Sequence, residues 1–173
     1  KVIEKVKIGS SLFDKDGAEI VEELVQKAKA KNVELHFPVD YVIGNKFAAD
    51  AKIDNVTDAD GIPDGWMGLD CGPKSNEIAR KVILSAKTIL WNGPAGVFEF
   101  ECFASGTKAA LDAVIEATEN GAVSIVGGGD TATAVAKWNK EDKISHVSTG
   151  GGASLELLEG KNLPGVAALS VKN

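Results

Sequence analysis

The apolar and polar positions in the second half of the chain predict one structural unit that is repeated three times. Each of three short apolar runs ends in a glycine-rich cluster and is followed by a stretch with helical spacing. The runs lie at residues 88–91, 122–126 and 144–147, and the helical stretches at about 104–119, 131–137 and 153–158. Strand, glycine turn and helix in this order predict βαβ units. We therefore expect an α/β fold with a Rossmann-like parallel sheet flanked by helices.

The first half of the chain has less regular patterns. Helical spacing predicts a helix over residues 17–32, which ends in a cluster of lysines and an asparagine. The apolar run at residues 33–37 predicts a short buried strand, with His36 as a core residue. Residues 52–72 are rich in glycine and aspartate and predict a loop, and residues 75–84 predict a helix with its first residue, a serine, as N-cap.

The three glycine clusters fall where parallel sheets bind their ligands, beyond the carboxyl ends of the strands. We expect them to line one crevice. Backbone N–H groups and helix N-termini in such turns provide positive potential without lysine, and glycine lets the backbone approach a phosphate closely. The structural alternative is that the glycines only tighten the turns between strand and helix.

Two acidic residues accompany these clusters. Asp130 follows the second cluster, where a carboxylate repels a phosphate unless a metal ion such as Mg²⁺ lies between them. Asp130 is also suited to be the N-cap of the helix that begins at Thr131, and both roles can hold together. Glu99 follows the first cluster, where it either accepts hydrogen bonds from ribose hydroxyls or is a solvated acid beside Glu101.

Composition and charge narrow the class of protein. The 173 residues are 44% hydrophobic and 25% charged, which is typical of one globular domain. No apolar run approaches the roughly 20 residues that span a bilayer, and the net charge of −6 disfavours a nucleic-acid partner. Cys71 and Cys102 lack a C-x-x-C spacing, and no signal-like segment opens the chain. We therefore expect a reducing cytosol.

Several known ligand-binding patterns are absent or incomplete. The sequence contains no G-x-x-x-x-G-K-[ST], no G-x-S-x-G and no zinc-ligand spacing among its histidines and cysteines. Residues 127–132 fit the G-x-G-x-x-A part of a dinucleotide-binding fingerprint, but the acid expected about 20 residues further on is missing. An NAD-dependent oxidoreductase is therefore the weaker alternative to a phosphate-binding enzyme.

Three long motifs, in this order, resemble the phosphoglycerate kinase family of eukaryotic type. They are Leu90-Trp91-Asn92-Gly93-Pro94-Ala95-Gly96-Val97-Phe98-Glu99, Gly127-Gly128-Gly129-Asp130-Thr131-Ala132 and His146-Val147-Ser148-Thr149-Gly150-Gly151-Gly152-Ala153-Ser154-Leu155-Glu156. Residues 35–40 and 61–70 fit the same family. The resemblance implies that residues 1–160 are part of the C-terminal, nucleotide-binding lobe of a two-lobed kinase. Residues 161–173 would be a tail that returns to the N-terminal lobe.

The resemblance also implies an activity: reversible phosphoryl transfer between 1,3-bisphosphoglycerate and Mg-ADP, giving 3-phosphoglycerate and ATP, by a cytoplasmic and usually monomeric glycolytic enzyme. The lobe that binds 3-phosphoglycerate and the phosphate-binding lysines of the family are not in this sequence. We therefore expect no turnover by this chain alone. A non-catalytic nucleotide-binding module is the alternative from a different class.

The site residues implied by the resemblance form three groups. The first borders the adenine and ribose and consists of Gly68, Leu69, Gly93, Gly96, Val97, Phe98 and Glu99, of which Glu99 would take the ribose hydroxyls. The second lies by the nucleotide phosphates and consists of Asn92, Gly128, Gly129, Asp130 and Thr131, of which Asp130 would carry Mg²⁺. The third would present a helix N-terminus to the transferred phosphoryl group and consists of Gly150, Gly151 and Gly152.

Overall fold

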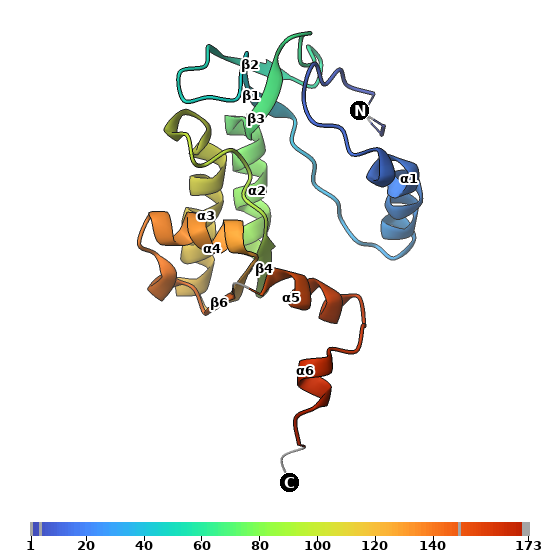
Figure 1. Ribbon diagram of the computed structural model, residues 1–173, viewed down its shortest axis with the longest axis vertical. Coiled ribbons are helices and arrows are strands. Elements are labelled where there is room, and N and C mark those ends of the chain that lie inside the picture. The colour runs from blue at the N-terminus through green and yellow to red at the C-terminus, as the bar shows by residue number, and fades with distance from the viewer. Residues whose placement is uncertain (1, 4, 149, 171–173) are drawn as a thin grey trace. The chain divides into compact units, whose positions relative to one another are not determined.

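The structure is a computed structural model and describes residues 2–3, 5–148 and 150–170 (Figure 1). It divides into two units, each described here by itself. The first unit comprises Lys1–Val82 and Ala95–Ala110, and the second comprises Ile83–Pro94 and Leu111–Asn173. Thr149, in the third glycine cluster, and residues 171–173, in the expected tail, lie outside the described residues.

The second unit contains the predicted parallel sheet. Its strands β4 (Thr88–Asn92), β5 (Val123–Gly127) and β6 (His146–Ser148) pair in the order β4-β5-β6, all parallel. The helices that follow them along the chain are α3 (Ser105–Glu119), α4 (Gly129–Lys137) and α5 (Gly151–Leu158); a 3-10 turn η2 (Glu141–Lys143) precedes β6, and a short helix α6 (Pro164–Ala167) lies near the C-terminus. The expected α/β fold is confirmed, as a parallel sheet of three strands that is not closed.

One face of this sheet carries the core of the second unit. The core consists of Ile89, Leu111, Val114, Ala117, Ala122, Val126, Val135 and Ile144. Because Cβ atoms alternate along a strand, these residues place α3 and α4 on the same face of the sheet. On the other face, Leu90 and Val123 are 38% and 51% exposed. Parallel sheets usually have both faces covered, so the described residues supply one of the two expected helical layers.

The first unit contains a sheet that the sequence did not predict. Strands β1 (Asp40–Gly44), β2 (Ile53–Thr57) and β3 (Met67–Cys71) form an antiparallel sheet in the order β2-β1-β3. The expectation of a loop over residues 52–72 is therefore wrong. β2 is an exposed edge strand and β3 is glycine-containing, so pairing with β1, rather than local propensity, makes them strands.

The helices of the first unit are α1 (Lys15–Ala30), all but the last three residues of α2 (Pro73–Ser85), and the N-terminal part of α3, which a 3-10 turn η1 (Glu101–Phe103) precedes. The helix expected at residues 17–32 is confirmed but begins earlier, because Asp14 Oδ1 accepts a hydrogen bond from Gly17 N at 3.0 Å. No residue of α1 is buried, and Ile20 and Leu24 of its apolar face are 53% and 51% exposed.

The segment between α1 and β1 is the second point at which the sequence prediction fails. Residues 33–37 are not a strand, and Val33 and Phe37 are 56% and 48% exposed. A strand needs a neighbour for its backbone hydrogen bonds, and no described strand pairs with these residues. His36 is therefore not a core residue. Its side chain is 39% exposed, and its Nε2 lies 3.1 Å from Glu34 Oε2.

Candidate functional site

The carboxyl ends of β4, β5 and β6 lie side by side. Asn92 is the register partner of Gly127, which in turn is the partner of Ser148. The turns that follow these three residues therefore meet at one edge of the sheet, as the sequence predicted.

The second and third glycine turns are in close contact at this edge. A Cβ atom on Gly151 would lie 2.5 Å from both the N and the Cα of Gly128, and 3.1 Å from Asn92 Oδ1. Gly128 itself has φ 93°, a conformation that favours glycine. The contact requires glycine at both positions, and it brings the Asn92 side chain, the start of α4 and the start of α5 together.

Neither of these two helices has a side-chain cap. The N-cap of α4 is Gly128 and the N-cap of α5 is Gly150, and neither glycine has a side chain to cap the first turn. Ser148 Oγ accepts a hydrogen bond from Gly150 N at 3.1 Å, just before the first residue of α5. The first N–H groups of a helix have no partner within the helix. Together with the helix dipole, such N–H groups form a binding site for an anion.

Asp130 lies in the first turn of α4 and is exposed. Its expected role as N-cap is wrong, because Gly128 occupies that position. Among the residues that the structure describes, no three His, Cys, Asp or Glu side chains come together as a metal site. Mg²⁺ is usually held by one or two carboxylates together with substrate phosphates. The exposed carboxylate of Asp130 thus fits Mg²⁺ as a single protein ligand, and phosphate oxygens and water would be the remaining ligands.

Thr131 differs from its neighbours because its side chain is buried. It is 1% exposed, and its Oγ1 accepts a hydrogen bond from Gly93 N at 2.8 Å. Within the second unit, this hydrogen bond joins the turn after β4 to the first turn of α4. Asn92 and Gly129, in contrast, are exposed.

The site residues predicted in the first unit lie on β3 and on the segment after β4. Leu69 and Phe98 are 8% and 3% exposed, so their side chains belong mainly to the core of this unit. Val97 N donates to Leu69 O at 2.9 Å, which ties the two segments together beside Gly68 and Gly96. The side chain of Glu99 is exposed and free to reach a ligand.

Sequence reasoning missed a pair of exposed and half-buried aromatic rings near Glu99. Phe47 is 62% exposed, and its ring packs edge-on against Phe100, with centroids 5.4 Å apart and an interplanar angle of 70°. An exposed aromatic face is a surface on which a nucleotide base can stack. The sequence signal was weak, because a single phenylalanine in a polar loop has no periodicity.

Sequence reasoning also missed two buried aspartates, which cap helices from a distance. Asp40 is 7% exposed, and its carboxylate accepts hydrogen bonds from Lys74 N at 3.0 Å and Ser75 N at 2.7 Å, at the start of α2. Ser75 is therefore not the N-cap; its hydroxyl donates to the same carboxylate at 2.6 Å. Asp70 is 4% exposed and accepts a hydrogen bond from Gly106 N at 2.8 Å, at the start of α3.

The pKa values of these two carboxyl groups move in opposite directions. Burial acts to raise the pKa of Asp40, but hydrogen bonds from the Ser75 hydroxyl and from the backbone of Lys74 and Ser75 outweigh it, and the pKa lies below its ordinary value. For Asp70, burial prevails over the backbone hydrogen bonds from Gly106, Cys71 and Ser105, and the pKa is raised. Neither carboxyl group is exposed to a ligand. Each therefore has a structural role, which is to accept hydrogen bonds from the first turn of a helix.

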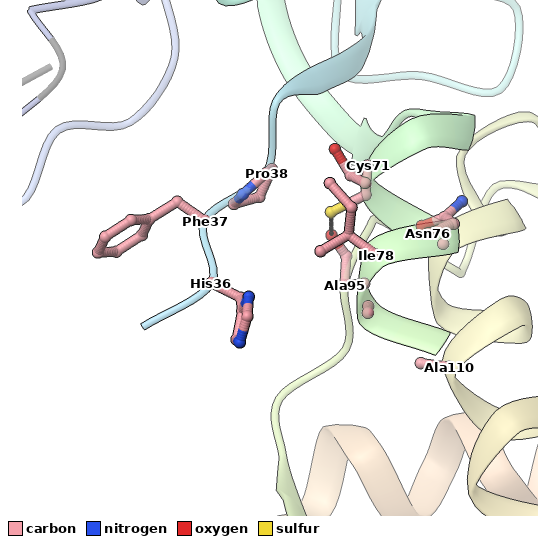
Figure 2. A pocket seen from close by; sticks show the side chains of 11 residues that line it. His36, Phe37, Pro38, Cys71, Asn76, Ile78, Ala95 and Ala110 are labelled. Carbon is pink, nitrogen blue, oxygen red and sulfur yellow. Dashed lines mark hydrogen bonds between the residues drawn. The ribbon is translucent and has the colours of Figure 1, made fainter. Parts of the chain in front are cut away.

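A cavity of about 100 Å³ lies in the first unit (Figure 2). Its lining is mostly apolar and consists of His36, Phe37, Pro38, Cys71, Ser75, Asn76, Ile78, Ala79, Ala95, Gly106 and Ala110. None of these residues was predicted to bind nucleotide.

Cys71 and Cys102 are both free cysteines. Burial raises the pKa of the Cys71 thiol to about 11, with the nearby charges of Asp70 and Asp40 adding to the effect, so this thiol is a poor nucleophile at neutral pH.

A parallel sheet with glycine turns and uncapped helix N-termini at its carboxyl edge is the arrangement of phosphate-binding α/β folds. Among the helices that the structure describes, none combines the length and the apolar character needed to span a bilayer. The sequence model of the phosphoglycerate kinase family matches residues 1–161. This chain belongs to the phosphoglycerate kinase family.

Individual relatives agree with the family model. The chain is 69% identical over 172 residues to the phosphoglycerate kinase of Yarrowia lipolytica and 64% identical to that of Funneliformis mosseae, covering 99% of this chain in each case. It spans 41% of the length of each of these two relatives. Among solved structures, phosphoglycerate kinase from Coxiella burnetii matches with a TM-score of 0.87 at 41% identity, over 95% of this chain and 41% of that one. The enzyme from Pyrococcus horikoshii matches with a TM-score of 0.73 at 29% identity, over 89% of this chain and 36% of that one.

Proposed function

We propose that this chain forms part of the nucleotide-binding lobe of a phosphoglycerate kinase. The whole enzyme would transfer a phosphoryl group between 1,3-bisphosphoglycerate and Mg-ADP, giving 3-phosphoglycerate and ATP in glycolysis. Residues 1–160 would belong to the lobe and residues 161–173 to a tail that reaches the other lobe. The observation that carries this proposal is the contact between Gly128 and Gly151, which brings two uncapped helix N-termini together at the carboxyl edge of a parallel sheet.

The second unit would bind the phosphates. The N–H groups of Gly128, Gly129 and the start of α4 donate to phosphate oxygens, and the exposed Asn92 amide lies beside them. Gly150, Gly151 and Gly152 present the start of α5 to the phosphoryl group during transfer. In phosphoryl transfer the protein mainly positions the reactants and stabilises the charge on the equatorial oxygens, and fixed N–H donors can do both.

Asp130 would hold the magnesium ion of the nucleotide. Bound Mg²⁺ neutralises part of the charge on the phosphates during transfer. The carboxylate of Asp130 is exposed in the first turn of α4, where the positive end of the helix dipole favours an acid. Thr131 would act beside the phosphates through Gly93, since its hydroxyl is buried against the N–H of that residue.

The first unit would bind the nucleoside. The exposed carboxylate of Glu99 accepts hydrogen bonds from the ribose hydroxyls. Gly68, Leu69, Gly96, Val97 and Phe98 form the backbone surface beside it, and the exposed ring of Phe47 offers an aromatic face for the base. 3-Phosphoglycerate would be bound mainly by the lobe that is not in this sequence. We propose a cytosolic monomer, in line with the resemblance.

A chimera tests this function directly. In it, this chain replaces the matching 41% of the Yarrowia lipolytica enzyme. We expect the chimera to form ATP from 1,3-bisphosphoglycerate and ADP, and we expect the 173-residue chain alone to show no turnover. A folded chimera that binds ADP without turnover would instead support a non-catalytic nucleotide-binding module. A chimera that prefers NAD to ADP in a competition titration would contradict the proposal.

The metal role of Asp130 has its own test in the chimera. We expect Asp130→Asn to weaken the binding of Mg-ADP by about tenfold, a loss of about 1.4 kcal/mol, and to weaken the binding of metal-free ADP much less. Titration calorimetry with and without Mg²⁺ measures both affinities. The matched control is Asp16→Asn, because Asp16 is an exposed acid in the first turn of α1, away from any glycine turn. Equal losses with and without Mg²⁺ would rule out the metal role.

A further inference from the structure

Thr107, in the first turn of α3, has a side chain that the sequence did not single out. It is 0% exposed. Its Oγ1 accepts hydrogen bonds from two successive backbone groups, Ala95 N and Gly96 N, each at 3.1 Å. One buried hydroxyl thus holds two peptide groups of the segment that follows β4.

The other backbone groups of this segment are fixed as well. Cys71 Sγ donates to Ala95 O at 3.8 Å, and Val97 N donates to Leu69 O at 2.9 Å. The carboxylate of Asp70 occupies the space in which a side chain on Gly96 would lie. Each backbone N–H from residue 95 to residue 97 therefore has an acceptor on β3 or α3.

The backbone fixed in this way, residues 95–97, is only two residues from Glu99, the exposed acid. Phe98 N donates to Gly96 O at 2.9 Å, and Phe100 N donates to Val97 O at 3.1 Å, so consecutive turns continue as far as Phe100 and include Glu99. Residues 93–99 have neither helical nor strand structure of their own. A segment without regular secondary structure is ordered by its contacts with neighbouring elements. If it became ordered only when the ligand binds, the lost conformational entropy would reduce the affinity for the ligand.

We propose that Thr107 is a positioning residue for the nucleoside end of the site. By accepting hydrogen bonds from Ala95 and Gly96, it holds Val97 and Glu99 in the geometry that binds the nucleoside before the nucleotide arrives. Valine has nearly the same shape as threonine but cannot accept these hydrogen bonds, and it would leave two partly buried N–H groups without this acceptor. The inference rests on the proposed function.

The test is a kinetic comparison in the chimera defined above. We expect Thr107→Val to raise the KM for Mg-ADP about tenfold while the KM for 1,3-bisphosphoglycerate stays within about twofold. Thr107→Ser restores the hydroxyl and should return the KM for Mg-ADP to within about threefold of the unsubstituted value. If the valine variant does not fold, Thr107→Ala, which leaves room for a water molecule, should still raise the KM for Mg-ADP selectively.

Thr118→Val is the matched control. Thr118 lies on the same helix, away from the segment after β4. Its hydroxyl donates to Val114 O at 2.6 Å, and its Oγ1 lies 2.7 Å from Ser124 Oγ. It should lower the thermal stability without changing either KM. Equal changes in both KM values for Thr107→Val, or the same kinetic effect from Thr118→Val, would overturn the inference. A chimera without turnover, even with Thr107 intact, would overturn the proposed function and the inference with it.

Discussion

The helices of the two units begin in opposite ways. In the first unit, the buried carboxylate of Asp40 accepts hydrogen bonds from N–H groups in the first turn of α2. The buried carboxylate of Asp70 does the same for the first turn of α3. In the second unit, α4 and α5 begin at glycines, and no described side chain caps them. A capped terminus contributes to the stability of the fold, whereas an open terminus keeps its N–H groups available for a ligand. We infer that the first unit uses its helix termini for stability and the second unit uses them for binding.

The largest expected effect is a loss of activity when a side chain is added at the contact between Gly151 and Gly128. In the chimera, Gly151→Ala should lower kcat/KM by about 100-fold, because the new Cβ must displace the Gly128 backbone, and shifts of about 1 Å at a catalytic edge have effects of this size. Steady-state kinetics at saturating 1,3-bisphosphoglycerate measures the change.

Gly165→Ala, in α6, is the matched control for this substitution. No atom lies within 4 Å of a Cβ placed on Gly165, and Gly165 is outside the proposed site, so the variant should stay within about threefold of the unsubstituted chimera. Equal activities of the two alanine variants would mean that the contact between Gly128 and Gly151 is not needed for catalysis.

A smaller effect is expected on the free energy of unfolding, and it distinguishes a buried acid that caps a helix from an exposed acid at an uncapped helix. Asp70→Ala should lower the free energy of unfolding of the 173-residue chain by about 2 kcal/mol, because it leaves the buried Gly106 N–H in the first turn of α3 without an acceptor. Asp130→Ala should lower it by less than about 1 kcal/mol, because Asp130 is exposed and loses only its interaction with the helix dipole. Urea unfolding followed by circular dichroism measures both values. A reversed order would contradict the assignment of capped and open termini.

The smallest expected effect is the pH dependence of the capped termini. The pKa of Asp40 is lower in the folded state than its ordinary value of 3.8, so its contribution to stability is present above pH 3.8 and is lost as the pH falls through the folded-state pKa. Asp40→Asn should therefore flatten the loss of stability in acid. For Asp70 the pKa is raised, so protonation favours the folded state and its contribution has the opposite sign. Urea midpoints between pH 2 and pH 6 measure the difference, and unchanged acid unfolding in Asp40→Asn would contradict it.

The open termini could be predicted from the sequence because their determinants are local. An apolar run, a glycine cluster and a helical stretch occur within about 15 residues of one another, and together they place the turn at the carboxyl edge of the sheet. The prediction of Asp130 as N-cap was wrong by only two positions, because Gly128 is the N-cap and the helix begins at Gly129.

The capped termini could not be predicted because their determinants are distant in the sequence. Asp40 caps a helix that begins more than 30 residues later, and Asp70 lies 36 residues from Gly106. Ser75, at the expected start of α2, has a side chain suited to a local cap, yet its hydroxyl donates to the carboxylate of Asp40. The antiparallel sheet was missed for the same reason, since the pairing of β2 and β3 with β1 makes strands of residues with weak local propensity.

Hydrogen–deuterium exchange of the chimera with and without Mg-ADP tests the central comparison most directly. We predict that Mg-ADP slows exchange in peptides that cover residues 127–132 and 150–153, where α4 and α5 begin without caps. Exchange in peptides that cover residues 73–76 and 105–107 should not change, because the first N–H groups of α2 and α3 already donate to Asp40 and Asp70. Protection at the starts of α2 and α3, with none at the starts of α4 and α5, would contradict the account.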